Sequence, residues 1–78
     1  MPKFFFHIRT AFNFQPDEDG WEFGSSALAR LGAIAAIREA LSPAMSRGHT
    51  IDGRWFEIAD EAGATVEVVS FNEAIRSA

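Results

Sequence analysis

The fold is decided by residues 54–71, which read RWFEIADEAGATVEVVSF. Polar and apolar side chains alternate in both halves of this stretch. The first half places Phe56 and Ile58 on one face, and the second half places Val66 and Val68 on one face. A period of two residues is typical of strands with one buried face. We therefore expect two strands that bury these four side chains.

The turn between the two strands is encoded by residues 60–63, DEAG. Gly63 suits the left-handed position of a bulged hairpin turn, because glycine has no Cβ to clash there. The stretch thus predicts an antiparallel hairpin. Beyond it, Asn72 is expected to cap one short helical turn that runs through Ile75.

A second alternating segment lies at residues 3–14, KFFFHIRTAFNF. One parity carries Phe4, Phe6, Ile8, Phe12 and Phe14, and the other carries Lys3, Phe5, His7 and Arg9. This pattern predicts a strand with Phe4, Phe6 and Ile8 on the buried face. Alternation across residues 10–11 is compatible with one long strand or with two strands and a bend. The turn residues QPDEDG at 15–20 then lead to a short strand at 21–23.

A helix is predicted from residues 25–26 onward, since either serine can cap the first backbone N–H groups. Successive steps of 100° predict a core-facing stripe of Ala27, Leu31, Ile34, Ile37, Leu41 and Met45. The opposite side is expected to carry Ala29, Ala33, Ala36 and Ala40. Pro43 cannot donate the bond to Glu39, so the helix is expected to break, kink or restart near Ser42. Gly48 is expected to end the helical stretch.

Together these elements predict an α+β fold in a single domain, residues 1–78. Its expected plan is a small antiparallel sheet of three to four strands with one principal helix on one face, in the order β-β-α-β-β. The chain is 47% hydrophobic and 13% aromatic, which indicates a packed core. Cysteine is absent, so no disulfide is expected and a cytoplasmic location is favoured. Neither a membrane span nor a signal peptide is predicted.

The order of these motifs resembles a family of short bacterial proteins defined only as a domain of unknown function. The resemblance rests on the opening FFFHIR, the PDEDG turn followed by WEF, the Ala-rich helix and the GRWFEIADEAG hairpin. It runs from about Phe4 to Phe71. The chain departs from the family pattern at residues 10–11, where an Asp-Gly or Gly-Gly pair is common, and at Pro43. The resemblance implies this fold and a cytoplasmic bacterial protein, but no activity, cofactor or catalytic residue.

The titratable residues form no catalytic or metal-binding motif. The densest acidic cluster, residues 17–19, lacks the spacing of a calcium loop and is interpreted as a solvated turn. His7 and His49 lack the spacing of zinc ligands. Pairing of His7 with Glu57 or Glu67 across strands is the candidate acid–base arrangement. Because a chain this small has little room for a pocket of about 300 Å³, we predict no enzyme activity, no cofactor and no metal.

A nucleic-acid interface is the alternative that the first strand raises. Its exposed parity, Lys3, Phe5, His7 and Arg9, combines basic and aromatic side chains as RNA-binding sheets do. Neighbouring Glu57 and Glu67 would neutralise this patch, and the net charge of −4 disfavours nucleic acid as a partner. Residues 16–48 also resemble, more loosely, the small HicB-type antitoxins. An antitoxin-type, nucleic-acid-linked regulator is therefore the alternative prediction.

The sheet face away from the helix is the predicted interaction surface. One principal helix covers only one face, so the side chains expected on the open face are Phe5, His7, Trp55 and Val69. Large apolar side chains exposed together indicate an interface. We therefore predict a non-enzymatic protein-interaction or regulatory module that forms a homodimer through these residues. The competing expectation is that residues 71–75 fold back across this face and leave a monomer.

Overall fold

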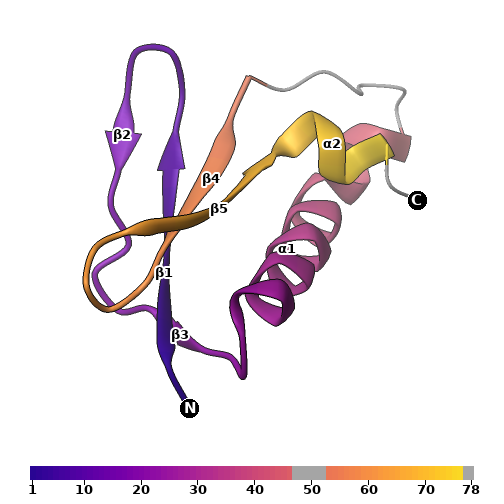
Figure 1. The fold of residues 1–78 in the computed structure, drawn as a ribbon. Coiled ribbons are helices and arrows are strands. Elements are labelled where there is room, and N and C mark those ends of the chain that lie inside the picture. The colour runs from indigo at the N-terminus through magenta and orange to yellow at the C-terminus, as the bar shows by residue number, and fades with distance from the viewer. Residues whose placement is uncertain (47–52, 77–78) are drawn as a thin grey trace.

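The computed structural model describes residues 1–46 and 53–76. The elements are β1 (Lys3–Arg9), β2 (Phe14–Gln15), β3 (Trp21–Glu22), α1 (Ser26–Ser46), β4 (Trp55–Ala59), β5 (Thr65–Ser70) and α2 (Phe71–Arg76). All strand pairs are antiparallel in the order β2-β1-β4-β5, and β3 pairs with the start of β1. Figure 1 shows both helices on the same side of the sheet. The predicted α+β fold is confirmed, and α2 adds a short second helix.

The β4–β5 hairpin has the turn predicted around Gly63, whose φ is 89°. The Asp60 Oδ1 atom accepts hydrogen bonds from the amides of Ala62 at 2.9 Å and Ala64 at 3.0 Å. The amide of Gly63 donates to the carbonyl of Asp60 at 3.0 Å. Ile58 and Ala59 of β4 pair with Glu67 and Thr65, so the extra residue of the bulge beside this turn is Val66 of β5.

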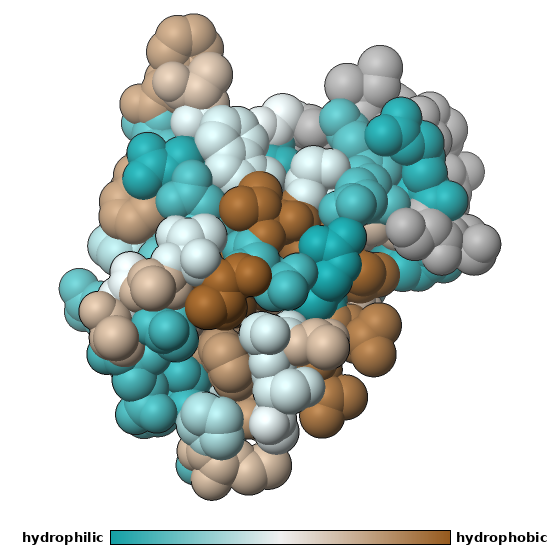
Figure 2. All heavy atoms as spheres, in the orientation of Figure 1, coloured by the Kyte–Doolittle hydropathy of each residue, from teal (hydrophilic) through white to brown (hydrophobic). Residues whose placement is uncertain are grey.

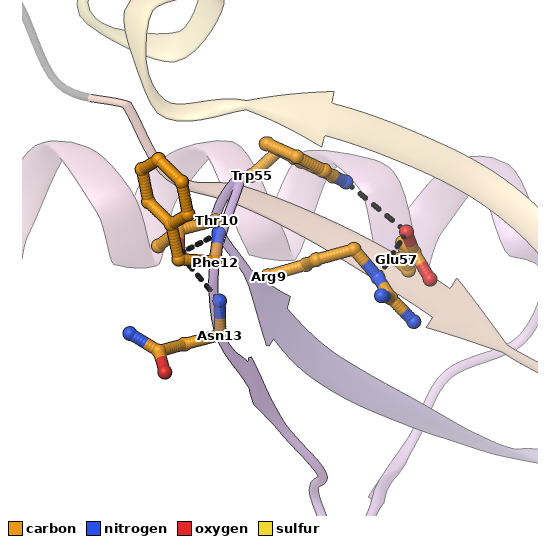
Figure 3. A network of polar contacts seen from close by, with 6 residues as sticks. All are labelled: Arg9, Thr10, Phe12, Asn13, Trp55 and Glu57. Atoms are coloured by element: carbon orange, nitrogen blue, oxygen red, sulfur yellow. Dashed lines mark hydrogen bonds and ion pairs between the residues drawn. The ribbon is translucent and has the colours of Figure 1, made fainter.

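The chain reverses between β1 and β2, so the first strand ends at Arg9 and does not run on to residue 14. The Thr10 Oγ1 atom accepts hydrogen bonds from the amides of Phe12 at 3.2 Å and Asn13 at 3.0 Å (Figure 3). Phe12 lies at the turn and is 93% exposed, while Phe14 pairs with Arg9. Of the two arrangements compatible with the alternation, two strands with a bend is the one that forms, and the reversal removes Phe12 and Phe14 from the parity of Phe4, Phe6 and Ile8.

The ends of α1 test the helix signals in the sequence. The predicted start is confirmed, because the Ser25 Oγ atom accepts a hydrogen bond from the amide of Leu28 at 3.2 Å. Of the outcomes expected near Ser42, a break or restart of the helix is wrong, since α1 continues through Pro43. The proline ring removes one hydrogen bond near the end of the helix, where few later bonds depend on it. The predicted end at Gly48 lies outside the described residues. No helix within the described ranges has the length and hydropathy needed to cross a membrane.

The side of α1 that contacts the sheet is not the one predicted. Its fully buried residues are Ala29, Ala33 and Ile37. Of the other stripe residues that the structure describes, Ile34 and Leu41 are partly buried, and Ala27 and Leu31 are exposed. The core of the sheet is filled by large side chains, including Phe4 and Phe71. The helix therefore packs against it with small residues, because core volume must be filled without overlap.

β5 also presents the opposite parity to the one predicted. Val69 pairs with Phe56 on the side of the helices and is fully buried. Glu67 shares that side, whereas Val66 is 37% exposed and Val68 is 54% exposed. The expectation that Val66 and Val68 are buried is therefore wrong.

Arg30 of α1 explains why a glutamate is tolerated on the inner side of β5. Its Nη1 atom lies 3.5 Å from Glu67 Oε1, and its Nη2 atom lies 2.8 Å from Glu73 Oε2. The same guanidinium donates a hydrogen bond to the carbonyl of Val68 at 3.1 Å. Arg30 thus joins α1, β5 and α2.

The C-terminal segment packs with α1 and not across the open side of the sheet. Its buried residues are Phe71, Ala74 and Ile75, and α1 is the element against which it mainly packs. The cap of α2 is Ser70 and not Asn72, because the Ser70 Oγ atom accepts a hydrogen bond from the amide of Glu73 at 3.0 Å. The expectation that residues 71–75 cover the open face is wrong for the described residues, which end at 76.

Candidate functional site

The side of the sheet opposite the helices, which we call the open face, brings together three of the four residues predicted to form an interface. The strand register places Phe5, His7 and Arg9 of β1 beside Ala59, Glu57 and Trp55 of β4. Phe14 and Val68 extend this face on β2 and β5, as the partners of Arg9 and Glu57. Val69 was predicted here but lies in the core under α1, because β5 has the opposite parity.

The centre of the open face is an ion pair that also holds an indole. The Arg9 Nε atom lies 2.8 Å from Glu57 Oε2, and the Trp55 Nε1 atom donates a hydrogen bond to the same oxygen at 3.1 Å (Figure 3). On its other side, the Arg9 guanidinium lies 4.4 Å from the centre of the Phe14 ring. The prediction that Glu57 neutralises the patch is confirmed, whereas Glu67 lies on the other side of the sheet.

The contacts of His7 are structural, and it does not pair with a glutamate. Its Nδ1 atom accepts a hydrogen bond from the amide of Asp17 at 3.0 Å. Its ring lies between Phe5 and Phe14, with centroid separations of 6.4 Å and 5.4 Å. Although His7 faces Glu57 across the ladder, the Glu57 carboxylate binds Arg9 and Trp55. The candidate pairing is therefore not formed, and His49 lies outside the described residues.

The acidic loop between β2 and β3 is tied to the edge of β1 by Asp17. Its Oδ2 atom accepts a hydrogen bond from the amide of Phe6 at 3.0 Å, between the stretches of β1 that pair with β2 and β3. Its Oδ1 atom accepts from the amides of Asp19 at 3.1 Å and Gly20 at 3.2 Å. Gly20 has a φ of 73°, and a Cβ there would lie 2.7 Å from the Lys3 side chain. The loop is thus an ordered turn against β1.

These contacts set the charge state of Asp17. Burial alone would raise the pKa of Asp17, because it disfavours the charged form. The hydrogen bonds from the amides of Phe6, Gly20 and Asp19, with the electrostatic effect of His7, together lower the pKa below its ordinary value. The carboxylate is therefore the form that the fold requires.

A groove lies on the other side of the sheet, between α1 and β1. α1 packs mainly against β5 and α2, which leaves part of the sheet beside β1 uncovered. The volume of the groove is about 650 Å³, and its floor is formed by Phe6, Ile8 and Phe56. The expectation that so small a chain has little room for a pocket is wrong. The sequence could not reveal this space, because it depends on where α1 crosses the sheet.

Apolar side chains also reach the surface outside these two sites. Figure 2 shows hydrophobic residues exposed among hydrophilic ones. Leu28 and Leu31 on the outer side of α1 are 51% and 62% exposed. Among the described residues, no three His, Asp or Glu side chains lie close enough together to hold a metal ion.

The fold and its surfaces define a small α+β protein with one sheet face covered by helices and one face open. A family model matches residues 3–72, and the chain belongs to that family, described as a domain of unknown function (DUF6894). No curated protein matches the chain. No solved structure matches it either. The family resemblance seen in the sequence motifs is confirmed.

Proposed function

We propose that the chain is a non-enzymatic protein-interaction module that self-associates through the open face. The observation that carries the proposal is the set of apolar side chains on this face, which neither helix covers. Phe14 and Val68 are 46% and 54% exposed, and Phe5 and Trp55 are partly exposed beside them. A surface of this kind is typical of an interface, because water contacts with grouped apolar side chains are unfavourable.

A second copy suits this face because its central charges are already paired. Arg9 and Glu57 neutralise each other within one chain, so two stacked copies would bury no unpaired charge. The aromatic side chains of this face are Phe5, Phe14 and Trp55. A fully buried aromatic side chain removes about 150–250 Å² of surface from water. Because they are partly covered already, the pairing falls at the low end of specific interfaces. We therefore expect a weak, micromolar dimer.

Pairing through the β5 edge of the sheet is disfavoured. β5 is an edge strand, and an exposed edge invites an added strand. The Arg30 guanidinium already donates a hydrogen bond to the carbonyl of Val68 on this strand, so an added strand would compete for that carbonyl. Face-to-face contact is therefore the route that the geometry favours.

Sedimentation equilibrium from about 10 µM to about 1 mM tests the proposal, a range that spans typical transient affinities. We expect a reversible dimer that Val68→Glu converts to a monomer. Leu31→Glu is the matched control, because Leu31 is exposed to a similar extent (62%, against 54% for Val68) but lies on the outer side of α1. A wild-type monomer over the whole range would contradict the proposal. A dimer broken by Leu31→Glu and not by Val68→Glu would place the interface on α1.

The antitoxin-type alternative remains a prediction from the sequence. The Arg9–Glu57 ion pair argues against it. Arg9 lies on the strand that would face nucleic acid, and its charge is already neutralised by Glu57 and is not free to bind a phosphate. A gel-shift experiment with mixed DNA and RNA at low salt separates the two functions. A shift at micromolar protein that Arg9→Gln abolishes would favour the alternative.

A further inference from the structure

The groove between α1 and β1 is distinct from the open face and lies on the opposite side of the sheet. Its floor is aromatic: the ring of Phe6 stacks on Phe23 with centroids 5.8 Å apart and meets Phe56 edge-on at 5.5 Å. A volume of about 650 Å³ falls within the range of about 300–1,000 Å³ that holds small organic ligands. The floor is suited to an alkyl or aryl group.

The side of the groove formed by α1 is lined by small residues. Gly32 and Ala36 line the groove, and a Cβ on Gly32 would lie 2.6 Å from the ring of Phe23. The helix and the aromatic floor are therefore in direct contact at Gly32, while the space beside Ala36 stays open. A larger side chain at position 36 would occupy the groove.

The opposite rim is acidic and carries an indole. Glu18, Asp19 and Trp21 line this side, and Trp21 is 64% exposed. Asp17 is bound to backbone amides, but within the described residues neither Glu18 nor Asp19 has a cation within ion-pair distance. Carboxylates beside an exposed indole favour a positively charged group, through charge attraction and a cation–π contact.

We infer that the groove binds a small organic cation with an apolar alkyl or aryl body. The body lies on the phenylalanine floor, and the cationic group lies between Trp21 and the carboxylates of the rim. The cavity and its lining carry the inference, and the rim sets the sign of the charge. The inference does not depend on self-association, because the open face contributes no residue to the groove.

The two tryptophans of the chain allow a direct measurement. Trp21 lines the groove and Trp55 lies on the open face, so Trp55→Phe leaves a reporter of the groove alone. Its emission is titrated at pH 7 with octylamine, which is protonated there, and with octanol and octanoate as neutral and anionic counterparts. We expect saturable changes, with octylammonium bound about fivefold or more tightly than octanol and octanoate bound most weakly. Trp21→Phe, which retains only Trp55, is expected to show no change.

Two further variants locate the binding. Ala36→Leu is expected to reduce octylammonium affinity at least tenfold by filling the groove. Ala35→Leu is the matched control on the same helix, because Ala35 is exposed and does not line the groove. The double variant Glu18→Gln/Asp19→Asn is expected to abolish the preference for octylammonium over octanol and to leave octanol binding unchanged.

Three results would overturn the inference. The first is an unchanged Trp21 emission with all three probes up to millimolar concentration. The second is equal affinity for octylammonium and octanol, which would remove the cation from the proposal. The third is equal loss of binding in Ala36→Leu and Ala35→Leu, which would place the probe outside the groove. None of these results bears on the dimer, which sedimentation tests separately.

Discussion

At the scale of single residues, Asp17 separates what the sequence can and cannot show. The acidic run 17–19 predicts a solvated turn, and Glu18 and Asp19 are exposed as that prediction requires. Asp17 differs because its carboxylate binds the Phe6 amide, on the edge of β1 between the residues paired to β2 and β3. That role depends on how three strands align, which the local sequence does not encode.

Asp17→Ala is expected to reduce the free energy of unfolding by about 1–3 kcal/mol, because three amides lose a charged acceptor. Urea denaturation of the purified variant measures the change. Asp19→Ala removes a neighbouring carboxylate that accepts none of these bonds, so its effect is expected to stay within about 0.5 kcal/mol. Equal effects of the two substitutions would contradict the assignment.

The acid limb of stability is expected to depend on the same residue. The pKa of Asp17 is lower in the folded state than in the unfolded chain. Its contribution to stability is therefore fully present above the unfolded pKa of about 4 and is lost as the pH falls through the folded pKa. Thermal unfolding between pH 7 and pH 2.5 should show a shallower acid decline in Asp17→Asn than in the wild type. Parallel declines would show that other carboxyl groups dominate.

At the scale of elements, the parity of β4 was predicted correctly and that of β5 was not. In β4, one parity holds Phe56 and Ile58 and the other includes Glu57, so the pattern is decisive. In β5 both parities contain valine, and the one with the glutamate is buried because Arg30 reaches it from α1. The helix was misjudged for a related reason: periodicity favoured its leucines, whereas a sheet core already filled by phenylalanines accepts alanines.

The packing of α1 predicts an inverted response to side-chain size. Ala33→Leu is expected to destabilise the protein by about 1–3 kcal/mol, because Ala33 is fully buried against the sheet and the larger side chain overfills the space. Leu31→Ala removes an exposed side chain, so its effect is expected to stay within about 0.5 kcal/mol. Thermal or urea unfolding compares the two. A larger destabilisation by Leu31→Ala than by Ala33→Leu would indicate that the stripe predicted from periodicity, and not the alanine side, packs against the sheet.

At the scale of the whole molecule, the described residues form a sheet with a different surface on each side. The open face could be predicted in outline, because strand alternation assigns Phe5, His7 and Trp55 to one side. The groove could not be predicted, since it arises from the position of α1 nearer to β5 than to β1. Phe14 joined the open face only through the reversal after Arg9. Alternation therefore predicts faces, whereas tertiary packing creates cavities.

This arrangement predicts that the two surfaces act independently. Val68→Glu is expected to break the dimer and to leave the affinity of the groove for octylammonium within about twofold, because effects of distant sites usually add. Titration of Trp21 emission in the Trp55→Phe background, with and without Val68→Glu, measures this coupling. A change of tenfold or more would indicate that dimerisation reshapes the groove.

The Arg30 contact with β5 has a consequence for how many copies can join. Strand-to-strand addition at an edge has no natural stopping point, because each arriving chain brings a fresh edge of its own. By holding the Val68 carbonyl, Arg30 makes the first step of such growth compete with an existing hydrogen bond. In the proposed dimer, stacking through the open face would end at two chains, since each copy has one such face. A single guanidinium thus disfavours open-ended growth through β5.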